Sequence, residues 1–352
     1  MDLRTIQSGG GGPLGAVARL GLSVLSAPFA AAACTRAWLY DRGVLAVRRC
    51  GRPVVAVGNV TAGGTGKTPF VAWLVAATRA VGRRPGILAR GYGPRPAGST
   101  LSDEGTLLAE LVGADVPQVE DPVRVRGAAT LLAAHPDVDL VVLDDGFQHR
   151  ALARDVDVVL VDATSPFGGG HFLPRGLLRE SPRALARADV VVLTRTDAVA
   201  PDALAALRAR VAALAPRAEV ALARTRATGL VAADGTRRPL AALAGAPVLA
   251  WSGIGNPAAF ERTLEAAGAR VVARRRAADH HRPTPAAVAA VLAAGARAGA
   301  TAVVVTRKDL VKLRGLASPP PDLWALDVET DVVEGREALL RRVAAAGRVP
   351  VR

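Results

Sequence analysis

The first residues that could do chemistry form a glycine-rich stretch, Thr61-Ala62-Gly63-Gly64-Thr65-Gly66-Lys67-Thr68. It matches the phosphate-binding pattern G-x-x-x-x-G-K-[ST], except that Thr61 replaces the first glycine. Its glycines allow backbone N–H groups to converge on phosphate oxygens, and the helix that follows directs its positive end at them. In this pattern Lys67 reaches the β- and γ-phosphates and the hydroxyl of Thr68 binds Mg²⁺. The stretch therefore predicts a site for a nucleoside triphosphate and its magnesium ion.

A pair of carboxylates supplies the second half of such a site. Asp144 and Asp145 directly follow the apolar run at 138–143, which has the composition of a buried strand. P-loop enzymes place an aspartate at the end of a neighbouring strand to hold or orient the metal ion. The pair is therefore predicted to contribute to the metal site, although the two patterns together do not identify the phosphate acceptor.

Composition also marks residues of interest. The 45 basic residues comprise 42 arginines and three lysines, at positions 67, 308 and 312, and only two asparagines occur, Asn59 and Asn256. A lysine retained in a chain that otherwise uses arginine suggests a site where a guanidinium does not serve.

The net charge of +14 is compatible with nucleic acid, an anionic membrane surface or an anionic substrate. No alternation of aromatic and basic residues and no zinc-finger spacing is present, so nucleic acid is not predicted as a partner. Cys34 and Cys50 provide neither a disulfide framework nor a metal-ligand spacing, which is typical of a reducing cytosol.

Short Val- and Leu-rich runs alternate with Ala-rich helical stretches along the body of the chain. This alternation predicts an α/β fold of the P-loop type, in which a parallel sheet has helices on both faces, followed by a smaller C-terminal α/β domain. We predict a P-loop domain over 48–225, a connection over 226–247 that contains an Asp-Gly turn, and the smaller domain over 248–352. The predicted strands are 53–57, 84–88, 138–143, 156–161 and 190–193, and then 248–251, 270–273, 302–305 and 323–326.

The N-terminal region differs from the rest. Residues 1–12 are polar and glycine-rich and are predicted to be disordered, whereas 13–47 are strongly apolar. The uncharged run from Leu20 to Cys34 is bracketed by Arg19 and Arg36, and its 15 residues fall short of the roughly 20 that a spanning helix needs. We predict a helix that lies on a membrane surface; a helix buried in the core is the alternative.

Further segments resemble the tetraacyldisaccharide 4'-kinase family, the lipid A 4'-kinases. The most distinctive is Asp144-Asp145-Gly146-Phe147-Gln148-His149, and the others follow in order from about residue 13 to 330. They include Val57-Gly58-Asn59, Arg90-Gly91-Tyr92-Gly93, Asp103-Glu104, Leu178-Arg179-Glu180, Gly253-Ile254-Gly255-Asn256-Pro257, Asp279-His280-His281 and Thr306-Arg307-Lys308-Asp309. The sequence departs from the family pattern at Arg307, where glutamate is usual, and at Ala277 and Ala278, which replace an aromatic residue.

The resemblance implies an enzyme that uses ATP and Mg²⁺ to phosphorylate the 4'-hydroxyl of a tetraacyldisaccharide 1-phosphate, a lipid A precursor. It also implies that the enzyme acts at the cytoplasmic face of the bacterial inner membrane. No protein partner is predicted. Asp103 is expected to be the catalytic base, paired with His280, with Lys67 and Arg179 as further catalytic residues. Substrate is expected at Glu104, Arg124, Gln148 and His149, and metal at Thr68, Asp144, Asp145 and Glu180.

Other interpretations remain open on the residues alone. Asp103 follows Ser102 at the start of a helix, so it could serve only in helix capping. A P-loop GTPase or ATPase of the metallochaperone type, or a basic membrane- or nucleic-acid-binding module that uses nucleotide as a switch, would also need residues 61–68. The metallochaperone type would need a Cys/His transfer site, which Cys34 and Cys50 are poorly suited to form, and the switch module would not need Asp103, Gln148 and His280 as a set.

Overall fold

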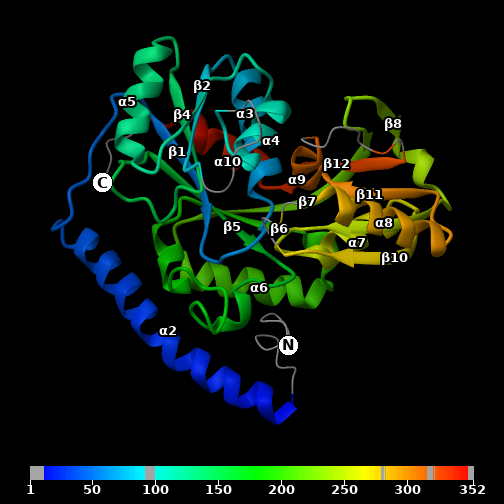
Figure 1. The fold of residues 1–352 in the computed structure, drawn as a ribbon. Coiled ribbons are helices and arrows are strands. Elements are labelled where there is room, and N and C mark those ends of the chain that lie inside the picture. Colours follow the sequence, from blue (N-terminus) through cyan, green and yellow to red (C-terminus); the bar gives the residue numbers. More distant parts are fainter. Residues whose placement is uncertain are drawn as a thin grey trace.

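One sheet organises the molecule (Figure 1). The computed structural model describes residues 12–91, 100–278, 281, 283–314, 320 and 322–347, and within them twelve strands form a single sheet. Eleven of the strands follow the order β10-β9-β11-β12-β7-β6-β5-β1-β4-β2-β3, and β8 pairs with β7 beside this path. The predicted α/β fold is confirmed, and its sheet is mostly parallel, with antiparallel pairing of β7 to β12 and to β8.

The first part of the sheet, here called the P-loop part, contains the strands β1 to β6, which are all parallel. Each strand predicted in this part is present, and β3 is an additional short edge strand. The strands are β1 (Val54–Asn59), β2 (Pro85–Ala89), β3 (Gln118–Glu120), β4 (Leu140–Asp144), β5 (Val156–Asp162) and β6 (Val190–Thr194). The helices are α3 (Lys67–Ala80), α4 (Asp103–Val112), α5 (Arg124–Ala134) and α6 (Pro201–Leu214), with the short 3₁₀ turns η1 (Gly168–Gly170), η2 (Pro182–Arg187) and η3 (Thr196–Ala198).

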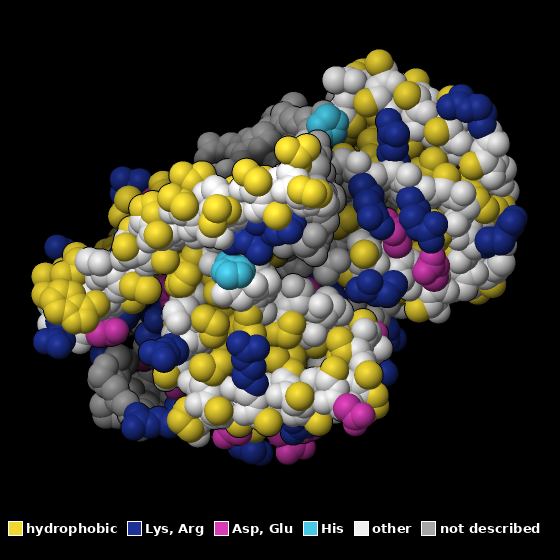
Figure 2. Space-filling model, turned by 90° about the horizontal axis from the view of Figure 1, so that it is seen from below, with side chains coloured by type: hydrophobic (Ala, Val, Ile, Leu, Met, Phe, Trp, Pro, Cys, Tyr) yellow, Lys and Arg dark blue, Asp and Glu magenta, His cyan; other side chains and the backbone are white. Residues whose placement is uncertain are grey.

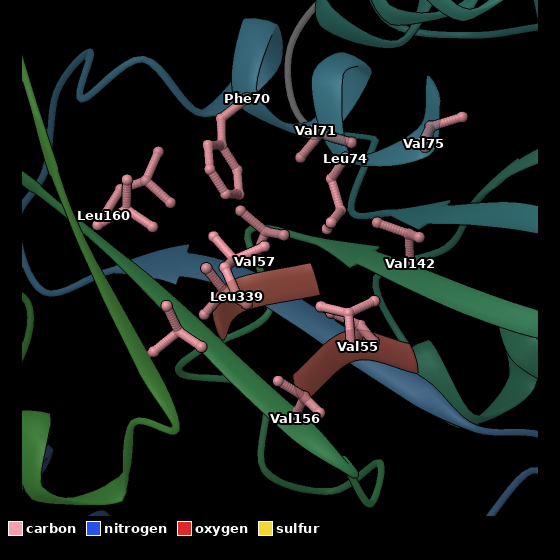
Figure 3. Packing of buried hydrophobic residues seen from close by; sticks show 14 of the residues in the cluster. Val55, Val57, Phe70, Val71, Leu74, Val75, Val142, Val156, Leu160 and Leu339 are labelled. Atoms are coloured by element: carbon pink, nitrogen blue, oxygen red, sulfur yellow. The ribbon is translucent and has the colours of Figure 1, made fainter. Parts of the chain in front are cut away.

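Helices cover both faces of this part because its central strands are apolar on both sides. On β1, Val55 and Val57 pack against α3, whereas Val54 and Ala56 point to the opposite face, where α5 lies. Figure 3 shows the first of these layers, with Phe70, Val71 and Leu74 of α3 above the strands. The end of β1, where the phosphate-binding stretch begins, is therefore fixed from two sides.

The second part, here called the C-terminal part, continues the same sheet. Its strands β9 (Pro247–Ser252), β10 (Arg270–Arg276) and β11 (Ala302–Thr306) are parallel to one another and to the start of β12 (Leu323–Glu334). Its helices are α7 (Pro257–Ala266), α8 (Pro285–Arg297) and α9 (Arg307–Leu313), while the last helix, α10 (Arg336–Ala344), returns to pack with α3.

Two long strands join the parts (Figure 1). The strand β7 (Glu219–Val231) pairs in parallel with β6 at its start and then runs antiparallel to β12 over most of its length. The sequence suggested a connection over 226–247, but this segment holds the end of β7, the strand β8 (Arg237–Pro239), the turn η4 (Leu240–Leu243) and the first residue of β9. Cross-strand ion pairs such as Arg224–Asp331 make much of this ribbon polar, so beyond the start of β12 it lacks the apolar run that predicts the other strands.

The helix α2 (Gly12–Asp41) lies along the outside of the P-loop part (Figure 1). It begins near the predicted position and ends six residues before the predicted boundary at 47, after which Gly43 has a positive φ. By length and composition, α2 is the one helix in the described residues that could cross a membrane, and 6% of its apolar window is buried in the fold. The alternative of a buried core helix is therefore wrong. The prediction of disorder for residues 1–12 falls, apart from Gly12, outside the described residues.

Apolar side chains follow α2 on the face seen in Figure 2, with basic side chains beside them. The exposed ones include Leu14, Val17, Leu20, Val24 and Leu25. The opposite side of the helix is held by polar contacts: the hydroxyl of Ser26 donates to the carbonyl of Phe172 (2.9 Å) and accepts from the N–H of Arg175 (3.0 Å). Between α2 and η2 lies a cavity of about 400 Å³, lined in part by Cys34, Trp38 and Arg183.

Candidate active site

The phosphate-binding stretch at 61–68 connects β1 to α3, as the sequence predicts. Gly66 lies directly before the helix with φ 86°, and Gly63 has φ 104°. Both values belong to the left-handed region, which side-chain-bearing residues rarely adopt. No side chain caps the start of α3, so its first N–H groups are available to an anion.

A buried asparagine organises the stretch. The side-chain Nδ2 of Asn59 donates to the carbonyl of Thr61 (2.7 Å) and to the hydroxyl of Thr65 (3.1 Å). Its Oδ1 accepts from Nζ of Lys67 at 3.1 Å. Asn59 therefore fixes both ends of the stretch. No site role is predicted for Asn59 from the sequence, although it lies in the segment Val57-Gly58-Asn59 and is one of only two asparagines in the chain.

Asp144, the last residue of β4, and Asp145, which follows it, lie beside Lys67, because β4 is the parallel neighbour of β1 and Asp144 pairs with Val57. The carboxylate of Asp145 lies 3.4 Å from Nζ of Lys67 and binds both terminal nitrogens of Arg179 at 2.9–3.1 Å. Burial tends to raise the pKa of Asp145, but the charges of Lys67 and Arg179 outweigh it and hold the pKa well below its usual range. Lys67, Asp145 and Arg179 thus form a charged cluster at the predicted phosphate site.

Asp144 has a different environment. Burial, followed by the charge of Asp145, raises its pKa to about 7. Its Oδ1 atom is buried, and no hydrogen-bond partner for it exists among the described residues. A buried carboxylate oxygen of this kind needs a partner, and Mg²⁺ prefers oxygen ligands.

The residues present fit a magnesium ion that is held jointly with a nucleotide. Within the described parts of the chain, no three His, Cys, Asp or Glu side chains come close enough to hold a metal ion without help. P-loop sites do not need such a cage, because the hydroxyl after the lysine and one carboxylate bind the ion together with the nucleotide phosphates. Thr68, in the first turn of α3, and Asp144 would supply these two groups.

We expect Asp144→Asn to stabilise the nucleotide-free protein at pH 8 while abolishing activity. The folded state holds the Asp144 proton more tightly than the unfolded state between about pH 4 and about pH 7, so ionisation costs stability as the pH rises through this window. The variant avoids that cost, and its melting temperature relative to wild type should increase from pH 5 to pH 8 in thermal melts.

The matched control is Asp145→Asn, because the pKa of the Asp145 carboxyl is shifted in the opposite direction to that of Asp144. This variant leaves Lys67 and Arg179 without their counter-charge and should be less stable than wild type at pH 8. Equal changes in melting temperature for the two variants would contradict the assigned environments.

Three further predicted residues lie near this cluster. Arg124, at the start of α5, is 2% exposed; its Nη1 donates to the carbonyl of Asp121 (3.1 Å), and its Nε has no partner among the described residues. Burial lowers the pKa of Arg124, while the nearby charges of Asp145 and Asp144 raise it. A buried guanidinium with a spare donor suits an anionic ligand.

Gln148 and His149 follow the aspartates. Nε2 of Gln148 donates to the carbonyl of Asn59 at 2.8 Å, and the backbone carbonyl of Gln148 accepts from Nη1 of Arg36, on α2, at 2.8 Å. Burial, with the charges of Arg124 and Arg36, lowers the pKa of His149 to about 4. His149 is therefore neutral at physiological pH and can offer hydrogen bonds rather than charge.

Asp103 is the first residue of α4, and its position is fixed by the cap of that helix. The hydroxyl of Ser102 accepts from the N–H of Gly105 (3.1 Å), so Ser102 caps the helix. Glu120 of β3 in turn binds the N–H (2.9 Å) and the hydroxyl (2.6 Å) of Ser102. Asp103, in the first turn of α4, is 2% exposed and does not cap the helix, because Ser102 does. Its predicted partner His280 lies outside the described residues.

Two other predicted residues have protein partners. Glu104 forms an ion pair with Lys308 of α9 (2.7 Å), which ties α4 to the C-terminal part. Glu180 is buried and bound by Arg187 of η2 (2.6 Å), and it lines the cavity beneath α2. The structure thus brings Lys67, Asp144, Asp145 and Arg179 together, whereas Glu104 pairs with Lys308 and Glu180 pairs with Arg187. The roles predicted for Glu104 in substrate binding and for Glu180 in metal binding stay predictions.

Comparison with known proteins gives a consistent result. The profile of the family described as tetraacyldisaccharide-1-P 4'-kinase matches residues 18–346. Tetraacyldisaccharide 4'-kinase of Anaeromyxobacter dehalogenans strain 2CP-C is 44% identical over 346 residues, which cover 93% of this chain and 90% of that protein. The protein of the same name from Geobacter metallireducens is 37% identical over 331 residues, covering 89% and 94%.

A solved structure also matches over nearly the whole chain. LpxK from Aquifex aeolicus, crystallised in complex with ATP, superposes with a TM-score of 0.69 at 25% identity. The match covers 92% of this chain and 99% of that one.

Proposed function

Because the chain belongs to the tetraacyldisaccharide-1-P 4'-kinase family, we propose that it transfers the γ-phosphate of ATP to the 4'-hydroxyl of a tetraacyldisaccharide 1-phosphate. The observation that carries the proposal is the position of Lys67, between Asn59 and Asp145 at the start of α3. Phosphoryl transfer asks an enzyme mainly for positioning and for neutralisation of charge. Lys67 and Arg179 supply cations at the place where the triphosphate would end.

The phosphate-binding stretch would hold the nucleotide, with its N–H groups on the phosphate oxygens. Thr68 and Asp144 would hold Mg²⁺, which neutralises charge on the phosphates when it is bound. Asp145 would keep Lys67 and Arg179 extended toward the γ-phosphate, because its carboxylate contacts both. When the nucleotide enters, these two cations can exchange part of their contact with Asp145 for phosphate oxygens.

The lipid substrate, which is the acceptor of the phosphoryl group, would approach from the side of Arg124, Gln148 and His149. Arg124 offers a buried cation, and Oε1 of Gln148 is buried and accepts no hydrogen bond from the described residues. Asp103 would accept the proton of the 4'-hydroxyl, with His280 as its partner. A carboxylate in this role needs a fixed position, and Ser102 with Glu120 supplies one at the start of α4.

The lipid substrate also requires contact with a membrane, and α2 is suited to provide it. We propose that α2 lies on the cytoplasmic face of the inner membrane, with its exposed apolar side chains among the acyl chains and arginines near anionic headgroups. The hydrogen bond from Arg36 of α2 to Gln148 would then connect the membrane surface to the acceptor side of the site.

A charge on the exposed face of α2 should release the protein from membranes. Val24 is 67% exposed on α2, so Val24→Glu should sharply reduce co-flotation with vesicles that contain anionic lipid while leaving the melting temperature unchanged. Val81, at the end of α3, is 64% exposed and gives a matched control. If Val24→Glu binds vesicles as well as Val81→Glu does, α2 is not the membrane contact.

The function itself is tested with the purified full-length protein, ATP and Mg²⁺, with and without tetraacyldisaccharide 1-phosphate in detergent. The expected result is a doubly phosphorylated lipid, identified by mass spectrometry, and ADP release that depends on the lipid. ADP release without any phosphorylated lipid would instead indicate a nucleotide-driven switch and contradict the proposal.

A further inference from the structure

A loop of the C-terminal part touches the phosphate-binding stretch. The loop is Gly253-Ile254-Gly255-Asn256, between β9 and α7, about 190 residues further along the chain. A Cβ atom placed on Gly255 would lie 2.6 Å from the backbone nitrogen of Gly64 and 3.1 Å from Cα of Gly63. Two backbones can approach this closely only without a side chain between them.

This contact concerns a group that the proposed function uses. The N–H of Gly64 belongs to the stretch that would cradle phosphate oxygens. Glycine is not required at 255 for conformational reasons, because its φ lies outside the left-handed region, unlike that of Gly63 and Gly66. The position of the phosphate-binding stretch alone therefore explains the absence of a side chain at 255.

The C-terminal part holds the loop firmly. Oδ2 of Asp309 accepts from the N–H of Gly253 (3.0 Å), and Nζ of Lys312 donates to Oδ1 of Asp309 (3.0 Å) and to the carbonyl of Gly253 (3.3 Å). The side chain of Lys312 is 1% exposed. A buried ion pair that also binds a backbone fixes that backbone in one place, because breaking it would leave a charge unpaired in the interior.

The P-loop part binds the same loop from the other side. Nδ2 of Asn256 lies 3.4 Å from Oδ2 of Asp162, at the end of β5. Arg195 pairs with the same carboxylate and donates to the carbonyl of Gly64 at 2.7 Å. The hydroxyl of Thr194 donates to the carbonyl of Thr65 at 3.0 Å. Gly64 is thus held at its carbonyl by Arg195 and covered at its nitrogen by Gly255.

We infer that Gly255 and Asn256 are positioning residues for the nucleotide: the loop 253–256 sets the conformation of the phosphate-binding stretch, so that ATP affinity depends on the C-terminal part. The inference rests on the proposed function for the identity of the nucleotide. Lys312 and Asp309 act behind the loop as its anchor. Asn256, the second asparagine of the chain, and Lys312, its third lysine, thereby have a structural role in the site.

The test compares Gly255→Ala with Gly295→Ala in the full-length protein. Gly295 lies in α8 of the same part, and a Cβ there meets side-chain atoms only at an ordinary 3.5 Å. We expect Gly255→Ala to raise the Kd for Mg·ATP, measured by calorimetry without lipid, and the KM for ATP by about tenfold or more. The KM for the lipid should stay within about twofold of wild type, and Gly295→Ala should match wild type throughout.

A second variant guards against loss of folding. The Oδ1 of Asn256 accepts from the N–H of Ala259 and so caps α7. Asn256→Asp keeps a good cap, but it removes the amide donor and places a negative charge against Asp162. A rise in the Kd for ATP at an unchanged melting temperature supports the inference, and an ATP affinity within twofold of wild type in this variant overturns it. A wild-type protein that binds ATP but does not phosphorylate the lipid would refute the proposed acceptor alone, because calorimetry without lipid measures the loop's effect separately.

Discussion

A Lys67→Met enzyme is expected to remain folded and to lose about 10³-fold or more in kcat. Nζ of Lys67 lies between Oδ1 of Asn59 and Oδ1 of Asp145, at the point where the γ-phosphate would arrive. The substitution removes a cation aimed at charge that develops during transfer. The fold should tolerate it, because Asp145 keeps its bidentate contact with Arg179. Initial rates of lipid phosphorylation with saturating ATP would measure the loss.

Lys67→Arg is the informative companion to that variant. It retains the charge, but its planar guanidinium is larger than the ammonium group that fits between Asn59 and Asp145. We expect a loss of at least tenfold in kcat, which would account for a lysine in a chain with 42 arginines. Activity within a few-fold of wild type for Lys67→Met would refute the assigned phosphate site.

Asp103→Asn is expected to lower kcat by about 10²- to 10⁴-fold, the usual contribution of a general base, with little change in ATP affinity. The carboxamide is nearly isosteric but cannot accept the proton of the sugar hydroxyl. The N-cap should persist, because the hydroxyl of Ser102 supplies it. Single-turnover phosphorylation and ATP calorimetry would separate the chemical step from nucleotide binding.

His280→Ala and the double variant test whether Asp103 works with a partner. Two groups that act as one unit give a double loss much smaller than the product of the single losses. Asp115→Asn is the control, since this exposed aspartate, just after α4, pairs with Arg79 at the surface and its loss should cost little. Fully multiplicative losses would show that Asp103 and His280 act independently.

Much of this site could be predicted because its chemistry is local in the sequence. The stretch 61–68 carries its own turn glycines, its lysine and its helix start, and β4 ends at Asp144 where an apolar run meets charge. The order of the strands then places Asp144 beside Val57 of β1. The family resemblance, carried by segments spread over the chain, is likewise confirmed by the match over residues 18–346.

Features that depend on contacts between distant residues could not be predicted. The pairing of Glu104 with Lys308 joins positions about 200 residues apart, and no local pattern marks it. The strand β7 and the second half of β12 stabilise each other by ladder hydrogen bonds and ion pairs, so the apolar run that predicts a strand covers only the start of β12, at 323–326. Asn59 stands out in the sequence by its rarity and by its place in Val57-Gly58-Asn59, but neither signal predicts its hydrogen bonds to Thr61 and Thr65.

The two cysteines differ enough to make α2 directly observable. Cys34 is exposed on α2, whereas Cys50 is partly buried, and burial raises the pKa of its thiol and suppresses the reactive thiolate. A maleimide fluorophore or nitroxide should therefore attach to the native chain at one position, without engineered substitutions. Collisional quenching of that single reporter by lipid-soluble and water-soluble agents would then give the depth of the helix in a bilayer, and its change when substrate is added.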